Sequence, residues 1–345
     1  MTANELWVII LPSFERFEQV MTDKPLQAWI ITNGNRGNEV LCEGVAERLN
    51  LSVRNIHVNS GKRLAPYWPA IWAAKKNPVM KPPWPDILLA SSRLAVPYAR
   101  YIRRASGGKT FTVFLHDPRV STALFDLVWA PEHDQLKGEN VISTLLSPHK
   151  FTQQRLKDEA NTWKNKLAKL PAKAKTKAQQ PILAVMIGGP NDVFEFSDSE
   201  CQKISRDIAA LADTYFPIIS LSRRSPASFK THFEQALQGK ACFIYNGDGE
   251  NPYPAMLGLA DQVLVTADST NMLSEACASG KPISVIPLKS RKSSKFQDFV
   301  GRLIEENLVT PFDGQLSDRP ATPRDDTDWI AEQIKSALQA RQQSC

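Results

Sequence analysis

Two series of short apolar runs, each alternating with helix-like segments, constrain the fold of this chain more than any other feature. The first series begins at Ala28-Trp-Ile-Ile31 and ends at Leu127-Val-Trp-Ala130. The second begins at Ile182-Leu-Ala-Val-Met-Ile187 and ends at Ile283-Ser-Val-Ile286. Such alternation is typical of parallel sheets built from right-handed βαβ units. The sequence therefore predicts an α/β protein with two Rossmann-like, parallel-sheet domains that face a cleft.

A basic segment bracketed by prolines separates the two series and is typical of an exposed linker. The length of 345 residues agrees with two domains at about 150 residues each. We therefore expect an N-terminal domain over residues 1–170, a linker over 171–181, a C-terminal domain over 182–325 and a C-terminal helix over 326–345.

Composition narrows the class of protein. The five cysteines are scattered and form no Cys-x-x-Cys pair, which indicates a reducing compartment and argues against disulfides or structural zinc. The net charge of +6 fits either an anionic partner or a solvated basic surface. No nucleic-acid-binding signature is present, so we expect no nucleic-acid partner. No apolar run approaches the roughly 18 residues that span a bilayer. We expect a cytoplasmic protein, with peripheral contact to an anionic inner membrane as an open alternative.

The stretch Thr266–Pro282 lies between two apolar runs and carries the most specific signal. A loop that leads from a parallel strand into a helix offers free backbone N–H groups and the positive end of the helix dipole, which suit phosphate. Glu275, one turn later, suits the paired hydroxyls of a ribose, but a capping box is an equally weighted alternative. Four small polar residues here are good N-cap residues: Asp268, Ser269, Thr270 and Asn271.

Three further loops of the second half follow strands. Gly188 and Gly189 allow close backbone approach to a phosphate, or form a plain tight turn. Arg223 stands in an Arg-Arg pair that either clamps a diphosphate or forms a solvated turn. Because the carboxyl ends of parallel strands meet at one edge, we expect the four loops on one face. They span residues 188–191, 222–226, 246–253 and 266–271.

In the first half, a glycine-containing loop also leads from a strand into a helix. By the same topological argument it is expected to face the loops of the second half. Its candidate residues are Asn33, Gly34, Gly37 and Asn38.

Two residues of the first half are candidates for a general base. His133 stands between Glu132 and Asp134, and an imidazole base needs a carboxylate to orient it. The alternative is a histidine held in a capped loop. Asp117 is the competing base, although Asp117-Pro-Arg119 also has the pattern of an Asx-turn.

These motifs resemble the mitochondrial-fission ELM-like family, which comprises the plant elongated-mitochondria proteins and many bacterial relatives. The resemblance extends from about residue 28 to the end of the second domain. It rests on Gly34-x-x-Gly37, Asp117-Pro-Arg119, Pro131-Glu-His-Asp134, Ile187-Gly-Gly-Pro190, Ser222-Arg-Arg224, Asn251-Pro-Tyr253 and the long motif Val265–Pro282.

The family looks like GT-B glycosyltransferases, and its second-domain loops resemble those of the peptidoglycan lipid-linked N-acetylglucosaminyltransferase. There the comparable loop and helix hold the nucleotide diphosphate, and the Glu matching Glu275 binds ribose hydroxyls. The resemblance implies an inverting GT-B glycosyltransferase that needs no metal or other cofactor. Its donor would be a nucleotide-diphosphate sugar. The net positive charge of the chain favours an envelope glycolipid or polysaccharide as the acceptor.

The resemblance also implies roles for the two domains. The N-terminal domain would hold the acceptor and supply the base, His133 or Asp117. The C-terminal domain would hold the nucleotide sugar, with Arg223 balancing the charge of the diphosphate and Glu275 on the ribose. The expected phosphate contacts are Gly188, Gly189, Ser269 and Thr270.

One loop departs from the family. Relatives commonly carry Thr-Asp-Gly-Lys-Pro-Gly-His, whereas this chain has Asn33 and Asn38 in place of the Asp and the His. Asparagine forms hydrogen bonds but does not shuttle a proton at neutral pH. This departure slightly favours a non-catalytic recruiting scaffold like the plant relatives, although the full set of second-domain loops disfavours one. A GT-B-like nucleotide-sugar epimerase, which needs several acid–base groups in the cleft, is a separate alternative.

Overall fold

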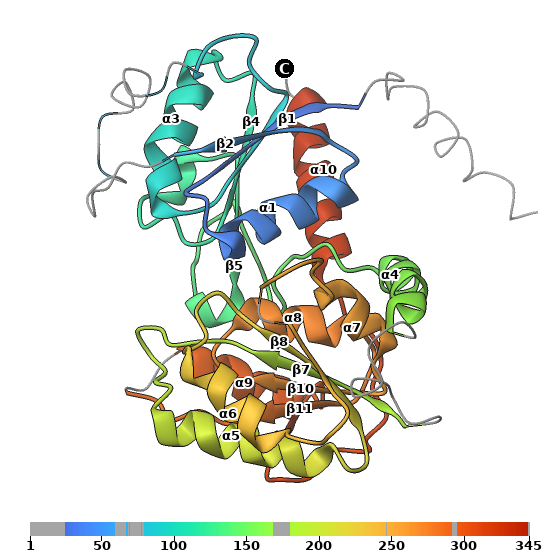
Figure 1. The fold of residues 1–345 in the computed structure, drawn as a ribbon. Coiled ribbons are helices and arrows are strands. Elements are labelled where there is room, and N and C mark those ends of the chain that lie inside the picture. Colours follow the sequence, from blue (N-terminus) through green and yellow to red (C-terminus); the bar gives the residue numbers. More distant parts are fainter. Residues whose placement is uncertain are drawn as a thin grey trace, which may run out of the picture.

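The computed structural model describes residues 25–58, 67, 69, 77, 79–167, 180–245, 247–291 and 295–343. Figure 1 shows two α/β domains, each built around its own sheet. Both sheets have six strands, all parallel, in the orders β2-β1-β3-β4-β5-β6 and β12-β11-β10-β7-β8-β9. The prediction of two Rossmann-like, parallel-sheet domains is confirmed.

The first part of the chain contains β1 to α4, with three short 3-10 turns η3, η4 and η5. The elements are β1 (Gln27–Thr32), α1 (Arg36–Arg48), β2 (Ser52–His57), β3 (Ile87–Ala90), η3 (Arg93–Ala95), α3 (Val96–Ala105), β4 (Phe111–Leu115), η4 (Thr122–Leu124), β5 (Leu127–Pro131), η5 (Glu132–Asp134), β6 (Val141–Thr144) and α4 (Gln153–Leu167).

The second part runs from β7 to α10. Its elements are β7 (Ile182–Ile187), α5 (Asp198–Leu211), β8 (Phe216–Leu221), α6 (Ser228–Ala236), β9 (Phe243–Tyr245), α7 (Tyr253–Leu259), β10 (Gln262–Thr266), α8 (Thr270–Cys277), β11 (Ile283–Ile286), α9 (Lys295–Glu305), β12 (Thr310–Pro311) and α10 (Thr327–Gln343).

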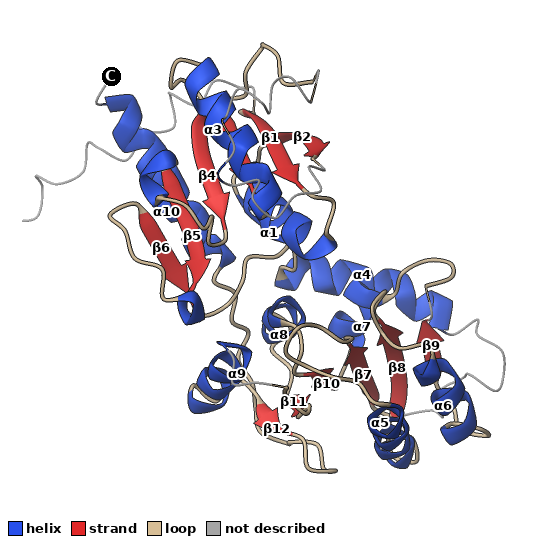
Figure 2. Ribbon diagram, turned by 90° about the vertical axis from the view of Figure 1, so that its left-hand side faces the viewer, coloured by secondary structure: helices blue, strands red, loops and turns tan. Residues whose placement is uncertain are grey.

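The central strands are largely apolar because helices cover both faces of each sheet, as Figure 2 shows, whereas the edge strand β2 is mostly polar and exposed. In β1, the side chains of Trp29 and Ile31 join one buried cluster and Ile30 joins another. In β7, Val185 and Met186 likewise belong to separate clusters on opposite faces. Because successive side chains of a strand point to opposite faces, a strand buried on both sides has a continuous apolar sequence.

Each strand order reverses once, and such a switch point leaves a crevice at the carboxyl ends of the strands. In the first sheet the reversal lies between β1 and β3, so the loops after Thr32 and Ala90 lie there. In the second it lies between β7 and β10, where the loops after Ile187 and Thr266 lie. Of the predicted loops, those after Thr32, Ile187 and Thr266 lie at the switch points, whereas those after β8 and β9 lie further along the second sheet.

The chain passes between the domains at two places. After β6 it enters α4, which packs on α7: a Cβ at Gly258 would lie 2.1 Å from the carbonyl oxygen of Leu156. After the second sheet, α10 returns to the first domain and packs on α1, β5 and β6, where Ile330 and Ile334 join a buried cluster. The predicted domain bounds stay predictions, and the predicted linker lies, apart from Gln180 and Pro181, outside the described residues.

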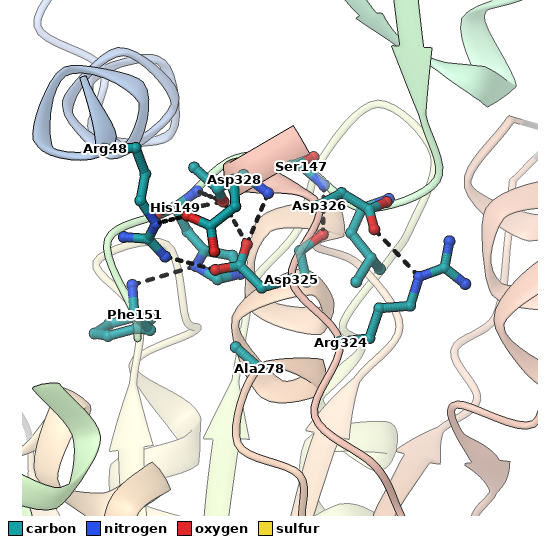
Figure 3. A network of polar contacts seen from close by, with 12 residues as sticks. Arg48, Ser147, His149, Phe151, Ala278, Arg324, Asp325, Asp326 and Asp328 are labelled. Atoms are coloured by element: carbon teal, nitrogen blue, oxygen red, sulfur yellow. Dashed lines mark hydrogen bonds and ion pairs between the residues drawn. The ribbon is translucent and has the colours of Figure 1, made fainter. Parts of the chain in front are cut away.

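A polar network holds the two crossings together (Figure 3). The backbone N–H of Leu146 donates to Asp326 at 2.9 Å, and that of His149 donates to the hydroxyl of Thr327 at 3.1 Å. Arg48 of α1 pairs with Asp325 at 2.6 Å. Helix α1 approaches closely because it has Gly44, where a Cβ would lie 2.7 Å from the backbone of His149.

In the described parts of the chain, no helix is both long enough and apolar enough to cross a membrane.

Candidate functional site

The loops after β7 and β10 are bound to each other. The backbone N–H of Gly188 donates to the Thr266 hydroxyl at 2.8 Å, and that of Gly189 donates to Asp268 at 2.9 Å. The fit leaves no room for side chains, since a Cβ at Gly188 would lie 2.1 Å from the Asp268 carboxylate oxygens and one at Gly189 would lie 2.3 Å from the Arg224 carbonyl oxygen. Glycine is required here by close packing.

Asp268 faces inward, although it was predicted as a nucleotide ligand. Its carboxylate also accepts a hydrogen bond from the Thr266 hydroxyl at 2.7 Å, and the side chain is fully buried. Burial raises its pKa, against the hydrogen bonds from Thr266 and Gly189 and the charge of Arg224. The residue therefore fixes the shape of the loop after β10, and its role towards a ligand stays a prediction.

The start of α8 has the predicted form. Ser269 is the N-cap, and its hydroxyl accepts a hydrogen bond from the Met272 N–H at 3.4 Å. The backbone N–H groups of Thr270 and Asn271, at the first two helical positions, have no partner among the described residues. Both N–H groups lie at the positive end of the helix dipole and are available to an anion.

The capping-box interpretation of Glu275 is wrong. Met272 occupies the third helical position, and the carboxylate of Glu275 accepts instead a 2.6 Å hydrogen bond from the hydroxyl of Tyr253, at the start of α7. Burial raises the pKa of Glu275 to about 7, against the Tyr253 hydrogen bond and the positive charge of Arg36. A buried carboxylate with one polar partner is suited to bind further hydroxyl donors.

The two arginines after β8 differ. Arg224 pairs with Asp268 at 3.4 Å and donates to the carbonyl oxygens of Gly189 and Pro190. Arg223, which was the predicted diphosphate partner, is exposed and has no partner among the described residues. Its positive charge is therefore available to a ligand, whereas Arg224 supports the glycine loop.

The loop over residues 246–253 is only partly described, since Asn246 lies outside the described residues. The amide oxygen of Asn251 accepts from the Tyr253 N–H at 3.0 Å, and Glu250 pairs with Lys166 of α4 at 2.5 Å. The hydroxyl of Tyr253, at the end of this loop, donates to Glu275 and so links the loop to α8. The spacing of the motifs did not predict this contact.

The glycine loop of the first domain touches α8 directly. The side-chain amide of Asn271 donates to the carbonyl oxygen of Gly37 at 3.1 Å. Behind this contact, the Asn38 amide donates to the Asn33 oxygen at 2.9 Å. Gly34 has φ +75°, a conformation that glycine adopts without strain. The loops predicted for acceptor and donor are therefore neighbours.

His133 lies at the boundary between the domains. Its ring packs edge-on against Phe299 of α9, with centroids 5.5 Å apart, and its Nδ1 is buried without a hydrogen-bond partner among the described residues. Burial lowers its pKa. The adjacent Asp134 binds Lys295 at 3.0 Å. The neighbouring carboxylates thus do not orient this imidazole.

Asp117 forms the Asx-turn that was its alternative role. One carboxylate oxygen accepts from the Arg119 N–H at 2.8 Å, and the other pairs with the Arg119 guanidinium at 3.0 Å. His116, which sequence reasoning passed over, has φ +139° at the end of β4, and Ser92 has φ +91° after β3. Strained residues of this kind are concentrated at functional sites. No sequence signal marks them.

The described residues contain no group of three or more His, Cys, Asp or Glu that would hold a metal ion. The roles predicted for individual site residues stay predictions.

Solved structures with the same fold share little sequence with this chain. One from Listeria monocytogenes, named as a UDP-N-acetylglucosamine 2-epimerase, is 11% identical with a TM-score of 0.52, covering 93% of this chain and 98% of that one. The Neisseria meningitidis UDP-GlcNAc 2-epimerase bound to UDP-GlcNAc is 11% identical with a TM-score of 0.50, covering 92% and 100%. Such likeness shows the fold alone, and it confirms the GT-B-like architecture.

Sequence comparison identifies the family. Mitochondrial fission protein ELM1 of Arabidopsis thaliana is 27% identical over 285 residues, which are 74% of this chain and 65% of that protein. The match thus spans slightly less than two thirds of the plant protein's length. The family model described as Mitochondrial fission ELM1 matches residues 36–338. With most of its length matched, this chain belongs to the mitochondrial fission ELM1 family.

Proposed function

We propose that this protein is a metal-independent, inverting glycosyltransferase that takes its sugar from a UDP-sugar. The acceptor is an envelope glycolipid or polysaccharide, approached from the first domain, with the protein at or near an anionic membrane surface. Uridine is favoured among nucleotides because a structure of the same fold is bound to UDP-GlcNAc.

One arrangement carries this proposal: a buried carboxylate and free helix N–H groups in the same short helix. Thr270 and Asn271 offer N–H groups to the diphosphate, and Glu275, one to two turns later, offers its carboxylate to the ribose. The arrangement faces the first domain, because Asn271 binds the carbonyl oxygen of Gly37.

The same residues supply what glycosyl transfer needs. When the sugar leaves the diphosphate, negative charge develops on the leaving oxygen, and preorganised dipoles and cations stabilise it. The helix dipole of α8 and the exposed guanidinium of Arg223 act on that charge. Gly188 and Gly189 bring the backbone close to the phosphates.

Calorimetric titration of the purified protein tests the binding step. We expect UDP-N-acetylglucosamine or another UDP-sugar to bind, and Glu275→Gln to weaken binding roughly 10- to 100-fold, because hydrogen bonds to a charged group contribute about 1.5–3 kcal/mol. The matched control is Glu234→Gln, at an exposed position of α6, with unchanged affinity. If no nucleotide sugar binds, the proposal fails.

An epimerase is the second candidate, and one observation favours it. Several acid–base groups lie after the ends of β4 and β5. The Nδ1 of His116 is 3.7 Å from a carboxylate oxygen of Asp134, and His133 is adjacent to Asp134 in the chain. Product analysis separates the two, because an epimerase returns a free UDP-sugar of altered configuration. The scaffold alternative, suggested by the plant relative, predicts no nucleotide-sugar binding.

A further inference from the structure

His57 ends β2, beside the glycine loop of the first domain, and no motif pointed to it. Its Nε2 lies 2.9 Å from the Oε1 of Glu39 in α1. An ionised carboxylate only accepts hydrogen bonds, so in the neutral imidazole the proton sits on Nε2. The lone pair is then on Nδ1. This is the arrangement of a histidine base oriented by a carboxylate.

The free nitrogen lies against the loop that lacks the family's Asp and His. A Cβ at Gly34 would lie 3.9 Å from the Nδ1 of His57, and the side chain is 61% exposed. The contact of the ring with a described polar group is through Nε2, and Nδ1 is left to solvent or a ligand. Asn33 and Asn38, which replace the acidic and basic residues of relatives, are bound to each other at 2.9 Å.

The same pair is linked to the proposed donor site. Glu39 also binds Arg36 at 3.4 Å, and Arg36 binds Glu43 at 2.9 Å. Arg36 adjoins Gly37, whose carbonyl oxygen accepts a hydrogen bond from Asn271 of α8 at 3.1 Å. Burial raises the pKa of Glu275, and the charge of Arg36 opposes this shift. His57, Glu39 and Arg36 thus form a ladder that leads from the edge of the first sheet towards Glu275.

The chain's other histidines are less suited to accept a proton. The Nδ1 of His116 accepts a hydrogen bond from the Asp117 N–H at 3.0 Å, so its neutral ring has only a donor left. His133 presents its free nitrogen to the protein interior, and His149 is 1% exposed. His232 binds Asp198 at 2.8 Å, on the α5–α6 side of the second domain.

We propose that His57 is the general base of the reaction and that Glu39 is its positioning residue; this rests on the proposed glycosyltransferase function. The acceptor hydroxyl gives its proton to Nδ1 of His57 while its oxygen forms a bond to the anomeric carbon. The bond from that carbon to the diphosphate oxygen breaks, and UDP leaves with the electron pair. With water as acceptor, the products are the free sugar and UDP.

The experiment measures UDP release from UDP-N-acetylglucosamine and other UDP-sugars, with water or an added envelope-glycolipid extract as acceptor. We expect His57→Gln to lower kcat by about 100-fold or more, while calorimetric affinity for the donor stays within about twofold. In the pH profile of kcat, measured at saturating donor, the acidic limb of the wild type disappears in this variant. Glu39→Gln keeps a hydrogen-bond acceptor but removes the charge that stabilises the imidazolium formed in the reaction, so kcat falls roughly 10-fold or more while donor affinity is unchanged.

The matched control is His232→Gln, which removes another carboxylate-bound histidine and leaves kcat unchanged. A His57→Gln protein with wild-type kcat and pH profile overturns the assignment, even if donor binding stands. A wild-type protein that binds the UDP-sugar but releases no UDP also contradicts it. Absence of all donor binding refutes the proposed function itself, and calorimetry tells these results apart.

Discussion

The two facing edges of the domains differ in how their polar groups are used. In the second domain, Gly188 donates to Thr266, Gly189 donates to Asp268, and Tyr253 donates to Glu275. In the first, His116 and Ser92 have strained backbones, and a nitrogen of His133 is buried without a partner among the described residues. Internally paired loops hold a fixed shape, which suits binding. Strain and unpaired groups are concentrated where chemistry is performed.

The largest expected effect comes from disrupting the paired edge of the second domain, formed by the hydrogen-bonded loops after β7, β8 and β10. At Gly189, alanine would place its Cβ 2.3 Å from the Arg224 carbonyl oxygen, so the loop after β7 must move away from the loop after β8. We expect Gly189→Ala to lower the free energy of unfolding by about 1–3 kcal/mol and to abolish UDP-sugar binding. Denaturant unfolding and calorimetry measure the two effects.

The control for this substitution is Gly301→Ala in α9, where a Cβ meets nothing within 4 Å. It is expected to stabilise the protein by roughly 0.5–1 kcal/mol, because alanine is the better helix former. A Gly189→Ala variant that behaves like this control would show that the paired edge is not rigid.

A smaller effect is expected from pH. Because burial raises the pKa of Glu275 to about 7, its carboxylate is mostly protonated at pH 6 and mostly ionised at pH 8. Ribose hydroxyls donate to the ionised form, so affinity for UDP-N-acetylglucosamine should rise by about tenfold over this range. Calorimetry at both pH values measures it, and the rise should vanish in Glu275→Gln.

The same shift affects stability in the opposite direction. The folded state holds the Glu275 proton more tightly than the unfolded chain, whose pKa is near 4.5. Its contribution to stability is therefore full below pH 4.5 and is lost as the pH rises through about 7.

The binding prediction has its own contradicting outcome. If donor binding depends on pH equally in the wild type and in Glu275→Gln, the Glu275 carboxylate does not bind the ribose.

The smallest effect on stability is expected at the strained edge of the first domain, which contains Ser92 and His116. Ser92 has φ +91° and ψ +138°, a region that glycine adopts freely. We expect Ser92→Gly to raise the free energy of unfolding by about 1 kcal/mol, less a few tenths for the lost cap on Leu94. Thermal and denaturant unfolding measure this gain.

The control is Ser121→Gly at the start of η4, where φ is −52° and the side chain makes no cap. Because that backbone is unstrained, glycine there should lower stability by roughly 0.5–1 kcal/mol. Loss of stability in both variants would mean that the first-domain edge stores no strain at Ser92.

Local signals predicted the start of α8 well. The run of N-cap residues before an apolar stretch predicted a helix start near Thr270, and Ser269 caps it. This worked because capping depends on residues within one turn. The sequence did not predict the partner of Glu275, because Tyr253 lies 22 residues earlier on α7.

The inward orientation of Asp268 was equally hidden. As an N-cap candidate it resembled Ser269, yet its carboxylate is held by Gly189, 79 residues away in the chain. His57 gave no signal in the sequence either. Its pairing with Glu39 of the preceding helix α1 is visible only in the folded structure.

The sequence alone determined the α/β class, the two parallel sheets and which loops lie at the strand ends, because hydrophobic periodicity and turn chemistry are local properties. Tertiary structure decided which polar groups satisfy one another and which are left for a ligand. Asp268, Glu275 and His57 are all polar residues near strand or helix ends, and their difference lies in partners brought from elsewhere in the chain. Burial and long-range hydrogen bonds, which depend on the whole fold, separate the structural carboxylate from the proposed binding carboxylate and the proposed base.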